Sequence, residues 1–169
     1  MPKTELDRAV QQSLLDRLID DDPYTSVASP LTHAESVRRL KASVRRDLEW
    51  LLNTRRTADP ERESFEELRR SLYYYGLPDI TSMSRDSVTA RNWLLRQVEA
   101  TIATFEPRLA GVRASMVESE DGSKRELHFL IEATLRMDPN PEQVVFDTVL
   151  YFSSGEVHVS GGGGGTAHA

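Results

Sequence analysis

Two long stretches within the first 105 residues place apolar side chains at every third or fourth position, the spacing typical of amphipathic helices. The clearer stretch begins at Thr32-His33-Ala34-Glu35, a capping box in which the Thr and Glu side chains pair with backbone donors at a helix start. Its apolar stripe consists of Val37, Leu40, Val44, Leu48, Leu51 and Leu52. Because Asn53-Thr54-Arg55-Arg56 follows the stripe, we predict that the helix ends there.

The second long helix is predicted from about Ser87 to Phe105, and two weaker helices precede it. One spans Thr4 to Asp20, and a short one runs from Phe65 to Leu72 and on to Gly76, a natural helix terminator. Trp50 lies off the main apolar stripe of its helix. Because tryptophan is highly buried on average, packing inside the domain is the favoured role of Trp50, and an interface is the alternative.

After Leu109 the hydrophobic pattern changes from a helical period to alternation. Strands are predicted for Leu109 to Val117, for Gln143 to Phe152 and for Glu156 to Val159. Another strand contains the alternating residues Leu127, Phe129, Ile131, Ala133 and Leu135. A turn at Glu120-Asp121-Gly122-Ser123 precedes that strand and suggests a hairpin. We therefore predict an α+β fold with N-terminal helices packed on one face of a C-terminal antiparallel β-sheet.

The length of 169 residues favours one folded domain. We predict an N-terminal helix and linker over residues 1–31, an α+β domain over residues 32–159, and a flexible tail over residues 160–169. The tail is predicted because five consecutive glycines cannot compensate by burial for the conformational entropy that ordering costs.

A rigid corner joins the second long helix to the first strand. Pro107 lacks an N–H group and disfavours a helical residue before it, so the helix is predicted to stop near Phe105 or Glu106. Glu106 and Arg108 place opposite charges on either side of the proline. Their side chains have three possible partners, namely each other, neighbouring helix ends or another protein, and the residues alone do not choose between them.

Composition and charge narrow the function classes. A formal net charge of −6 argues against a general nucleic-acid binder, because phosphate contacts need clustered Lys and Arg. The absence of cysteine excludes disulfides and thiol catalysis and is compatible with a reducing compartment. No signal-peptide core and no run of about 18 apolar residues is present, so we expect a cytoplasmic protein without direct membrane insertion.

The residues contain no convincing active site. Glycoside hydrolysis needs two carboxylates across a cleft, one with a raised pKa, and Arg108 as a neighbour would lower the pKa of Glu106. The four histidines, His33, His128, His158 and His168, show no metal-binding or triad spacing. No phosphate-binding or dinucleotide-binding glycine pattern occurs before a helix. We therefore predict no catalytic residue, no metal and no cofactor.

Five motifs occur along the chain in a characteristic order. They are Ser13-Leu14-Leu15-Asp16-Arg17-Leu18, Ser43-Val44-Arg45-Arg46-Asp47-Leu48-Glu49-Trp50-Leu51-Leu52-Asn53-Thr54-Arg55, Tyr75-Gly76-Leu77-Pro78-Asp79, Phe105-Glu106-Pro107-Arg108-Leu109 and Phe146-Asp147-Thr148-Val149-Leu150. From about Gln12 to Val159 the chain resembles the TssE family of type VI secretion baseplate subunits. That family is similar to the lysozyme-like wedge proteins of contractile phage tails.

The resemblance implies a small structural subunit of the baseplate wedge that helps to nucleate the contractile sheath. The implied partners are wedge subunits like TssF, TssG and TssK and sheath proteins like TssB and TssC, assembled at the cytoplasmic face of the inner membrane. The family signature matches Glu106, Pro107 and Arg108 residue by residue and is linked in the family to assembly contacts. These three residues are therefore the predicted partner-binding site, and a purely structural clamp is the main alternative.

Two other function classes stay open. A peptidoglycan-hydrolysing, lysozyme-like enzyme is the alternative to the assembly subunit, and loss of turnover on Glu106→Gln would identify it. A regulatory helical adaptor is the third class, which a stable free sheet edge would disfavour.

Overall fold

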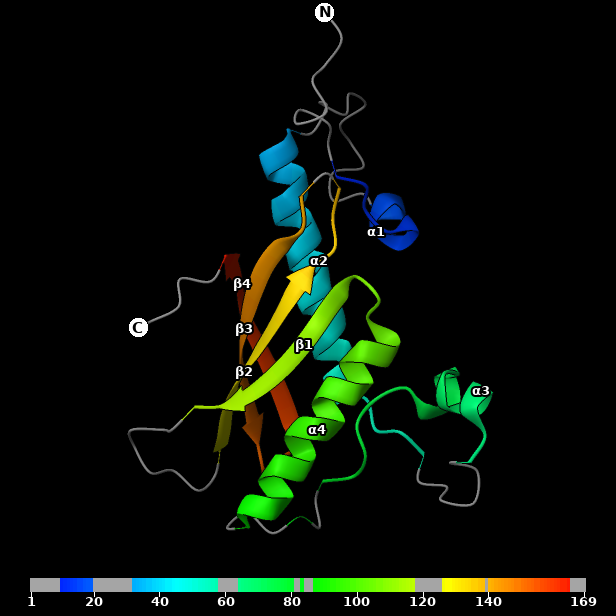
Figure 1. The fold of residues 1–169 in the computed structure, drawn as a ribbon, viewed down its shortest axis with the longest axis vertical. Helices are drawn as coiled ribbons and strands as arrows, with labels where there is room; N and C mark the ends of the chain where they lie inside the picture. Colours follow the sequence, from blue (N-terminus) through cyan, green and yellow to red (C-terminus); the bar gives the residue numbers. More distant parts are fainter. Residues whose placement is uncertain are drawn as a thin grey trace, which may run out of the picture.

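The computed structural model describes residues 10–19, 32–57, 64–80, 83, 87–117, 126–138 and 140–164. Helices come first, namely α1 (Leu14–Leu18), α2 (His33–Asn53), α3 (Glu66–Arg69), the 3₁₀ helix η3 (Leu72–Tyr74) and α4 (Val88–Phe105). The strands follow as β1 (Leu109–Met116), β2 (Glu126–Leu135), β3 (Glu142–Tyr151) and β4 (Glu156–Gly164). They form an antiparallel sheet in the order β1-β2-β3-β4, which confirms the predicted α+β fold (Figure 1).

Both long helices begin and end close to the predicted residues. The Thr32 hydroxyl accepts the Glu35 N–H at 3.2 Å at the start of α2, as the capping box predicted. The Ser87 hydroxyl accepts the Ala90 N–H at 3.2 Å in the same way at the start of α4. Within the part of the chain that the structure describes, no helix is long and apolar enough to cross a membrane.

The hydrophobic core lies between the two long helices and one face of the sheet. The alternating residues predicted for β2, from Leu127 to Leu135, are all buried, with at most 3% of their surface exposed. They form one cluster with the buried residues that α2 and α4 contribute, which are Leu40, Val44, Leu48, Leu51, Leu52, Leu94, Leu95, Val98 and Ile102. Alternation in the strands and the three-to-four spacing in the helices therefore point at the same core.

The first helix is shorter than predicted. Residues 10–13 of the predicted helix Thr4–Asp20 are not helical, and α1 begins only after Ser13, whose hydroxyl accepts the Asp16 N–H. The Val10 N–H instead donates to the Ser36 hydroxyl of α2 at 2.9 Å. Because α1 has no buried residue, no packed face stabilises further helical turns. Residues 4–9 and 20 of the predicted helix, and residues 21–31 of the predicted linker, lie outside the described residues.

The last strand is longer than predicted, because β4 continues past Val159 to Gly164 and includes half of the predicted flexible tail. Residues 160–164 pair with β3, which supplies the ladder hydrogen bonds that outweigh the weak strand propensity of glycine. Gly161 and Gly162 form a bulge with φ of 86° and 93°, where a side chain would be strained. A Cβ on Gly162 would also lie 3.1 Å from Cε1 of Phe146.

The two outer strands of the sheet are β1 and β4, and a helix side chain caps each of them at one point. The Glu99 carboxylate of α4 accepts the Ala114 N–H of β1 at 2.8 Å. The Asn53 amide at the end of α2 both donates to the Val157 carbonyl and accepts from the Val157 N–H of β4, each at 2.8 Å. Capping of this kind limits pairing with another chain.

The described residues between α2 and α4 form only short helices. The predicted helix from Phe65 to Leu72 is divided into α3 and η3, and its apolar ends, Phe65 and Leu72, are exposed. The predicted break at Gly76 is present, and the backbone of Leu77 there makes a parallel bridge with Arg55. The predicted turn Glu120–Ser123 lies outside the described residues.

Candidate functional site

The corner that follows α4 carries an ion pair inside the chain. Phe105 is the last residue of α4, and the Glu106 N–H still donates to Ile102 O at 2.8 Å. Only 6% of the Glu106 side chain is exposed. Both of its carboxylate oxygens accept from Arg108, Oε1 from Nε at 2.6 Å and Oε2 from Nη2 at 2.5 Å. Among the partners that the sequence left open, Glu106 and Arg108 thus contact each other, and Pro107 between them is exposed.

Helix α2 brings a second carboxylate to the same guanidinium. Arg108 Nη2 also donates to Asp47 Oδ2 at 2.6 Å, and Nη1 lies 3.4 Å from the buried Ser43 hydroxyl. A guanidinium suits this position because its planar fork donates to two acceptors at once. The corner is therefore attached to α2 as well as to α4 and β1.

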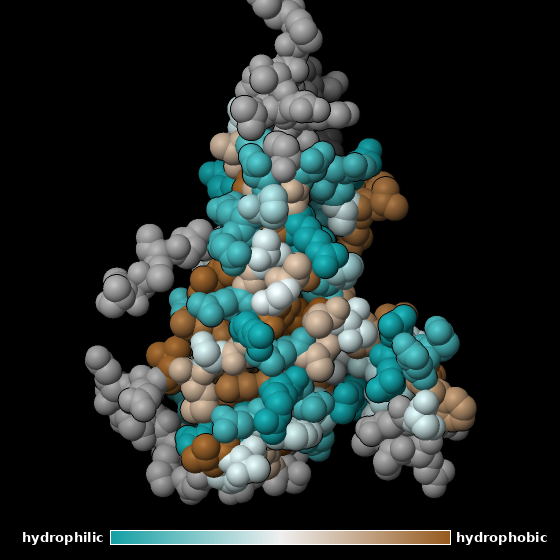
Figure 2. All heavy atoms as spheres, viewed as in Figure 1, coloured by the Kyte–Doolittle hydropathy of each residue, from teal (hydrophilic) through white to brown (hydrophobic). Residues whose placement is uncertain are grey.

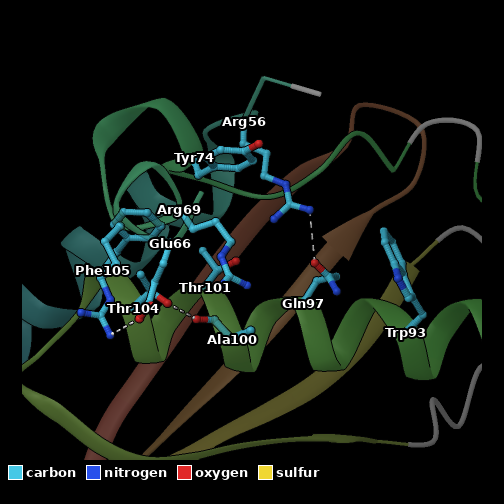
Figure 3. Close-up of a pocket in the computed structure, with 11 residues that line it drawn as sticks. Arg56, Glu66, Arg69, Tyr74, Trp93, Gln97, Ala100, Thr101, Thr104 and Phe105 are labelled. Carbon is cyan, nitrogen blue, oxygen red and sulfur yellow. Dashed lines mark hydrogen bonds and ion pairs between the residues drawn. The ribbon is translucent and has the colours of Figure 1, made fainter. Parts of the chain in front are cut away.

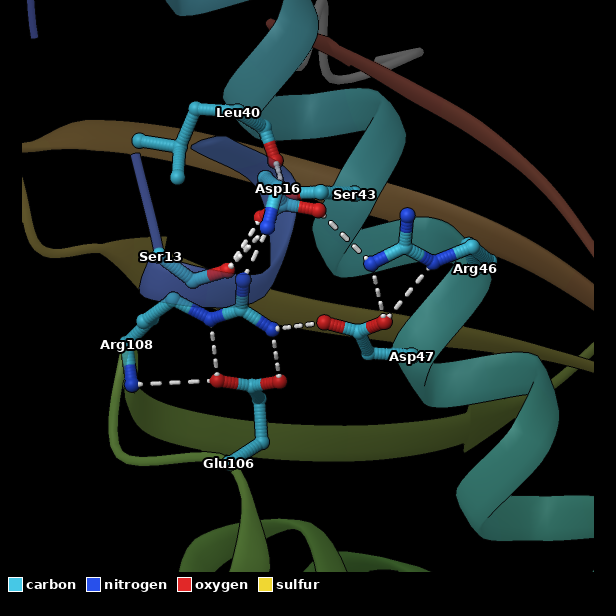
Figure 4. Close-up of polar contacts among 8 residues, drawn as sticks. All are labelled: Ser13, Asp16, Leu40, Ser43, Arg46, Asp47, Glu106 and Arg108. Carbon is cyan, nitrogen blue, oxygen red and sulfur yellow. Dashed lines mark hydrogen bonds and ion pairs between the residues drawn. The ribbon is translucent and has the colours of Figure 1, made fainter. Parts of the chain in front are cut away.

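The contacts continue from Asp47 to α1 (Figure 4). Arg46 donates to Asp47 Oδ1 and to Asp16 Oδ1, each at 2.8 Å, and Ser13 donates to Asp16 Oδ2 at 2.6 Å. Burial raises the pKa of Asp16, but the hydrogen bonds from Ser13 and Arg46 and the Arg46 charge outweigh it, so the pKa lies below its ordinary value. Negative and positive side chains alternate along these contacts, in the order Glu106, Arg108, Asp47, Arg46 and Asp16. We call these five residues, with Ser13 and Ser43, the clamp network.

The clamp network is partly shielded from water, and this affects its electrostatics. Burial lowers the pKa of Arg108, but the hydrogen bonds to Glu106 and Asp47 and their charges outweigh burial and raise the pKa above its ordinary value. Burial and the charges of Asp47 and Glu106 also raise the pKa of the neighbouring Tyr75. The charged form of Arg108 is therefore favoured by its two carboxylate partners.

The sequence predicted Glu106, Pro107 and Arg108 but not their partners. Ser43, Arg46 and Asp47 were part of a recognised motif, yet their roles were not assigned. Their spacing of three and four residues places them on one face of α2, beside the buried stripe, and this was an available signal. Asp16 gave no such signal, because its contact with Arg46 joins residues 30 positions apart.

Apolar side chains lie exposed next to the clamp network. In helix α1, Leu14 is 75% exposed, Leu18 is 81% exposed and Leu15 is about half exposed, as is Ile19 directly after the helix. Figure 2 shows a brown projection where Figure 1 places α1. Trp50 is 55% exposed, so the favoured prediction that it packs inside the domain was wrong. Its ring is contacted instead by the Arg46 guanidinium, 4.9 Å from the ring centroid.

A separate cleft of about 630 Å³ lies between α4 and the segment from Arg56 to Tyr74 (Figure 3). Arginines and aromatic rings line it, and Glu66 is the sole carboxylate among the described lining residues. Glu66 pairs with Arg70 at 3.3 Å. Among its described lining residues, the cleft therefore has no facing pair of carboxylates of the kind that glycoside hydrolysis uses.

The clamp network does not have the geometry of a hydrolase site either. Arg108 lies between the carboxylates of Glu106 and Asp47 and binds both, in the place where a glycosidase needs its substrate. Among the described residues, no group of three or more potential ligand side chains is placed to hold a metal ion. Of the histidines, His128 pairs with Glu126 and His158 with Glu49, and His168 lies outside the described residues.

The sequence profile of baseplate wedge protein gp25 matches residues 38–140. This range is more than half of the chain and contains most of α2, the corner and β2, whereas α1, β3 and β4 lie outside it. A comparison with curated proteins gives no match. The chain therefore belongs to the gp25 family of baseplate wedge proteins, the family that includes TssE, and its role is that of a structural component of a phage-tail-like baseplate.

Proposed function

We propose that this chain is the TssE subunit of a type VI secretion baseplate, where it binds neighbouring wedge subunits and helps to nucleate the sheath. The proposed wedge partners resemble TssF, TssG and TssK, and the proposed sheath partners resemble TssB and TssC. The baseplate that contains the chain would assemble at the cytoplasmic face of the inner membrane. Membership of the wedge family supports this assignment.

One observation carries the proposal for wedge binding. The exposed apolar residues at α1 are Leu14, Leu15, Leu18 and the following Ile19. We call these four residues, together with the exposed Trp50 and Pro107, the wedge surface. A helix of five residues is not stable by itself, so the contacts of Asp16 with Arg46 matter for holding α1 in place. An apolar surface that polar contacts hold in position is suited to binding a partner.

Within this surface the three corner residues have different proposed roles. Pro107 is exposed and contacts the partner directly. Arg108 is partly exposed and contributes its outer edge, while the buried Glu106 holds the guanidinium in place. The corner thus combines the predicted partner-binding role with a structural one.

The surface is best tested on α1 rather than on the corner. Arg108→Glu would bring a third carboxylate next to Glu106 and Asp47, so unfolding would accompany any loss of binding. The double variant Leu14→Glu/Leu18→Glu changes two exposed side chains and should leave folding intact. Leu72→Glu is the matched control, because Leu72 is equally exposed at another place on the molecule.

The measurement is copurification of the full chain with its wedge subunits, together with thermal unfolding of each variant. We expect Leu14→Glu/Leu18→Glu to abolish copurification while Leu72→Glu retains it, with similar melting temperatures for all three chains. Full copurification of the double variant would show that α1 does not contact the wedge.

For sheath nucleation we propose strand addition to the outer edge of β4, because an edge strand presents unpaired N–H and C=O groups. The Val157 groups on that edge are occupied by Asn53. Since the outward groups alternate along an antiparallel strand, those of Val159 also face away from β3. The edge that accepts a strand would therefore begin at Val159.

Val159→Pro removes the outward N–H without removing a ladder donor, and Val159→Ala controls for the lost packing of this buried side chain. We expect Val159→Pro to stop sheath assembly and Val159→Ala to permit it. Sheath assembly on the proline variant would refute strand addition at β4.

The domain division is also a proposal. We propose that residues 1–31 are an N-terminal helix and linker attached to a wedge domain that begins at residue 32. Limited proteolysis of the full chain tests this division, and resistance of residues 20–31 to cleavage would contradict it.

A further inference from the structure

A groove of about 460 Å³ lies beside the outer edge of β4, between α2 and the glycine bulge. Its lining residues are Ala34, Val37, Arg38, Lys41, Ala42, Arg45, Gly161 and Gly162. The α2 residues among them follow at steps of three and four, so they form one stripe along the helix. The alanines of this stripe and the two glycines of β4 leave room for the side chains of an added strand.

The groove is positively charged, although the whole chain carries a net charge of −6. Arg38 and Arg45 are exposed, and neither forms an ion pair with another of the described residues. Lys41 lies between them and pairs with Glu142 at 2.8 Å. No carboxylate lines the groove among the residues that the structure describes.

The acidic residues of α2 contact other side chains and not Arg38 or Arg45. Glu35 pairs with Arg39 at 3.5 Å, Asp47 belongs to the clamp network, and Glu49 lies 2.8 Å from His158 Nδ1. Helix α2 therefore does not neutralise Arg38 and Arg45 itself. Two cations that have no ion-pair partner within the described part of the chain, next to a strand edge, indicate an acidic partner.

The position of Asn53 sets where that partner lies. Its two hydrogen bonds close the edge at Val157, so an added strand pairs with β4 from Val159 toward Gly161 and Gly162. This part of the edge is next to the groove. One set of alternate side chains of the added strand would face the stripe on α2.

We propose that the strand added to β4 is acidic on the side that faces α2, and that Arg38 and Arg45 select it by charge. The inference rests on the strand addition proposed above and names the chemistry of the strand. The two arginines are seven positions apart, which is about 10 Å along a helix. Side chains on one face of a strand are about 7 Å or 13 Å apart at i, i+2 and i, i+4, within reach of two flexible arginines.

The test compares two short fluorescent peptides, one alternating Val with Glu and the other alternating Val with Gln, by anisotropy with the full chain. At low salt we expect the Glu peptide to bind roughly tenfold more tightly than the Gln peptide, and high salt should reduce the difference. The preference should disappear in Arg38→Glu/Arg45→Glu. It should persist in Arg69→Glu/Arg96→Glu, a control with the same charge change at exposed positions.

Equal binding of the two peptides, no binding of either, or a preference that survives Arg38→Glu/Arg45→Glu would overturn the charge selection. Val159→Pro separates this failure from failure of strand addition. If the two peptides bind equally and Val159→Pro abolishes their binding, strand addition stands and only the charge selection fails. If Val159→Pro does not change the binding, both strand addition and charge selection are refuted. Tighter binding of the Glu peptide to a chain with Asp20, Asp21 and Asp22 all changed to Asn would identify that acidic run as the occupant of the groove and overturn the proposal.

Discussion

Asn53, the last residue of α2, completes the outer edge of β4 at Val157 as a neighbouring strand would. Its amide donates to the Val157 carbonyl and accepts from the Val157 N–H, both at 2.8 Å, and it donates to Glu49 O as well. One side chain therefore attaches the end of α2 to the sheet and blocks part of an exposed edge.

Replacing Asn53 with Ala should destabilise the protein and expose more of the edge. Two backbone groups of Val157 lose their partners, and we expect the free energy of unfolding to fall by about 1–2 kcal/mol. Denaturant unfolding measures the loss, and light scattering measures self-association through the longer free edge. Asn53→Ser, with a side chain too short to reach both groups, should behave like Asn53→Ala; unchanged stability of both variants would contradict the role of the amide.

Arg108→Ala should destabilise the protein strongly, although the Arg108 side chain is partly exposed. It leaves the carboxylate of Glu106 buried without a cation, so we expect a loss of about 3 kcal/mol or more in the free energy of unfolding. Arg108→Lys keeps the charge but not the planar fork and should lose less. Arg39→Ala removes the exposed pair with Glu35 and should change stability by less than about 0.5 kcal/mol. Equal effects of Arg108→Ala and Arg39→Ala would mean that the clamp network does not stabilise the fold.

Acid should weaken the attachment of α1 through Asp16. The pKa of Asp16 is lower in the folded protein than its ordinary value of 3.8, so its carboxylate stabilises the fold above that value. This contribution is lost as the pH falls through the lower folded pKa. The stability difference between the wild type and Asp16→Asn should therefore be constant above about pH 5 and shrink toward zero in stronger acid.

Denaturant unfolding at a series of pH values measures this difference. Glu66→Gln is the control, because Glu66 and Arg70 form an exposed pair whose removal should have little effect at any pH. A difference between the wild type and Asp16→Asn that stays the same at every pH would show that the charge of Asp16 does not hold α1.

Glu106→Gln should affect stability and not peptidoglycan turnover. The amide keeps the shape of the side chain but loses its charge, so the paired hydrogen bonds with Arg108 weaken by about 1–3 kcal/mol. Hydrolysis of peptidoglycan by the wild type and by the variant should equal the background. Turnover by the wild type that Glu106→Gln abolishes would instead establish the lysozyme-like alternative.

Several elements could be predicted from signals that lie within a few residues of one another. The capping box at Thr32 and the three-to-four spacing of α2 predicted that helix, and the proline after Glu106 predicted where α4 ends. Alternation predicted β2 with its buried face. The pattern also predicted a rigid corner with opposite charges at Glu106 and Arg108, although it left the partners of these two side chains open.

The contacts between polar groups from distant parts of the chain could not be predicted in this way. Asp47 and Arg108 are 61 residues apart, and Asn53 and Val157 are 104 apart, so no local pattern relates them. Contacts between distant parts of the chain also explain why the predicted lengths of α1 and β4 were wrong. Helix α1 begins later than predicted because no surface buries its leucines, and β4 continues through glycines because β3 supplies its hydrogen bonds. Local patterns act between neighbours in sequence, whereas long-range partners are set by the elements that the shared hydrophobic core brings together.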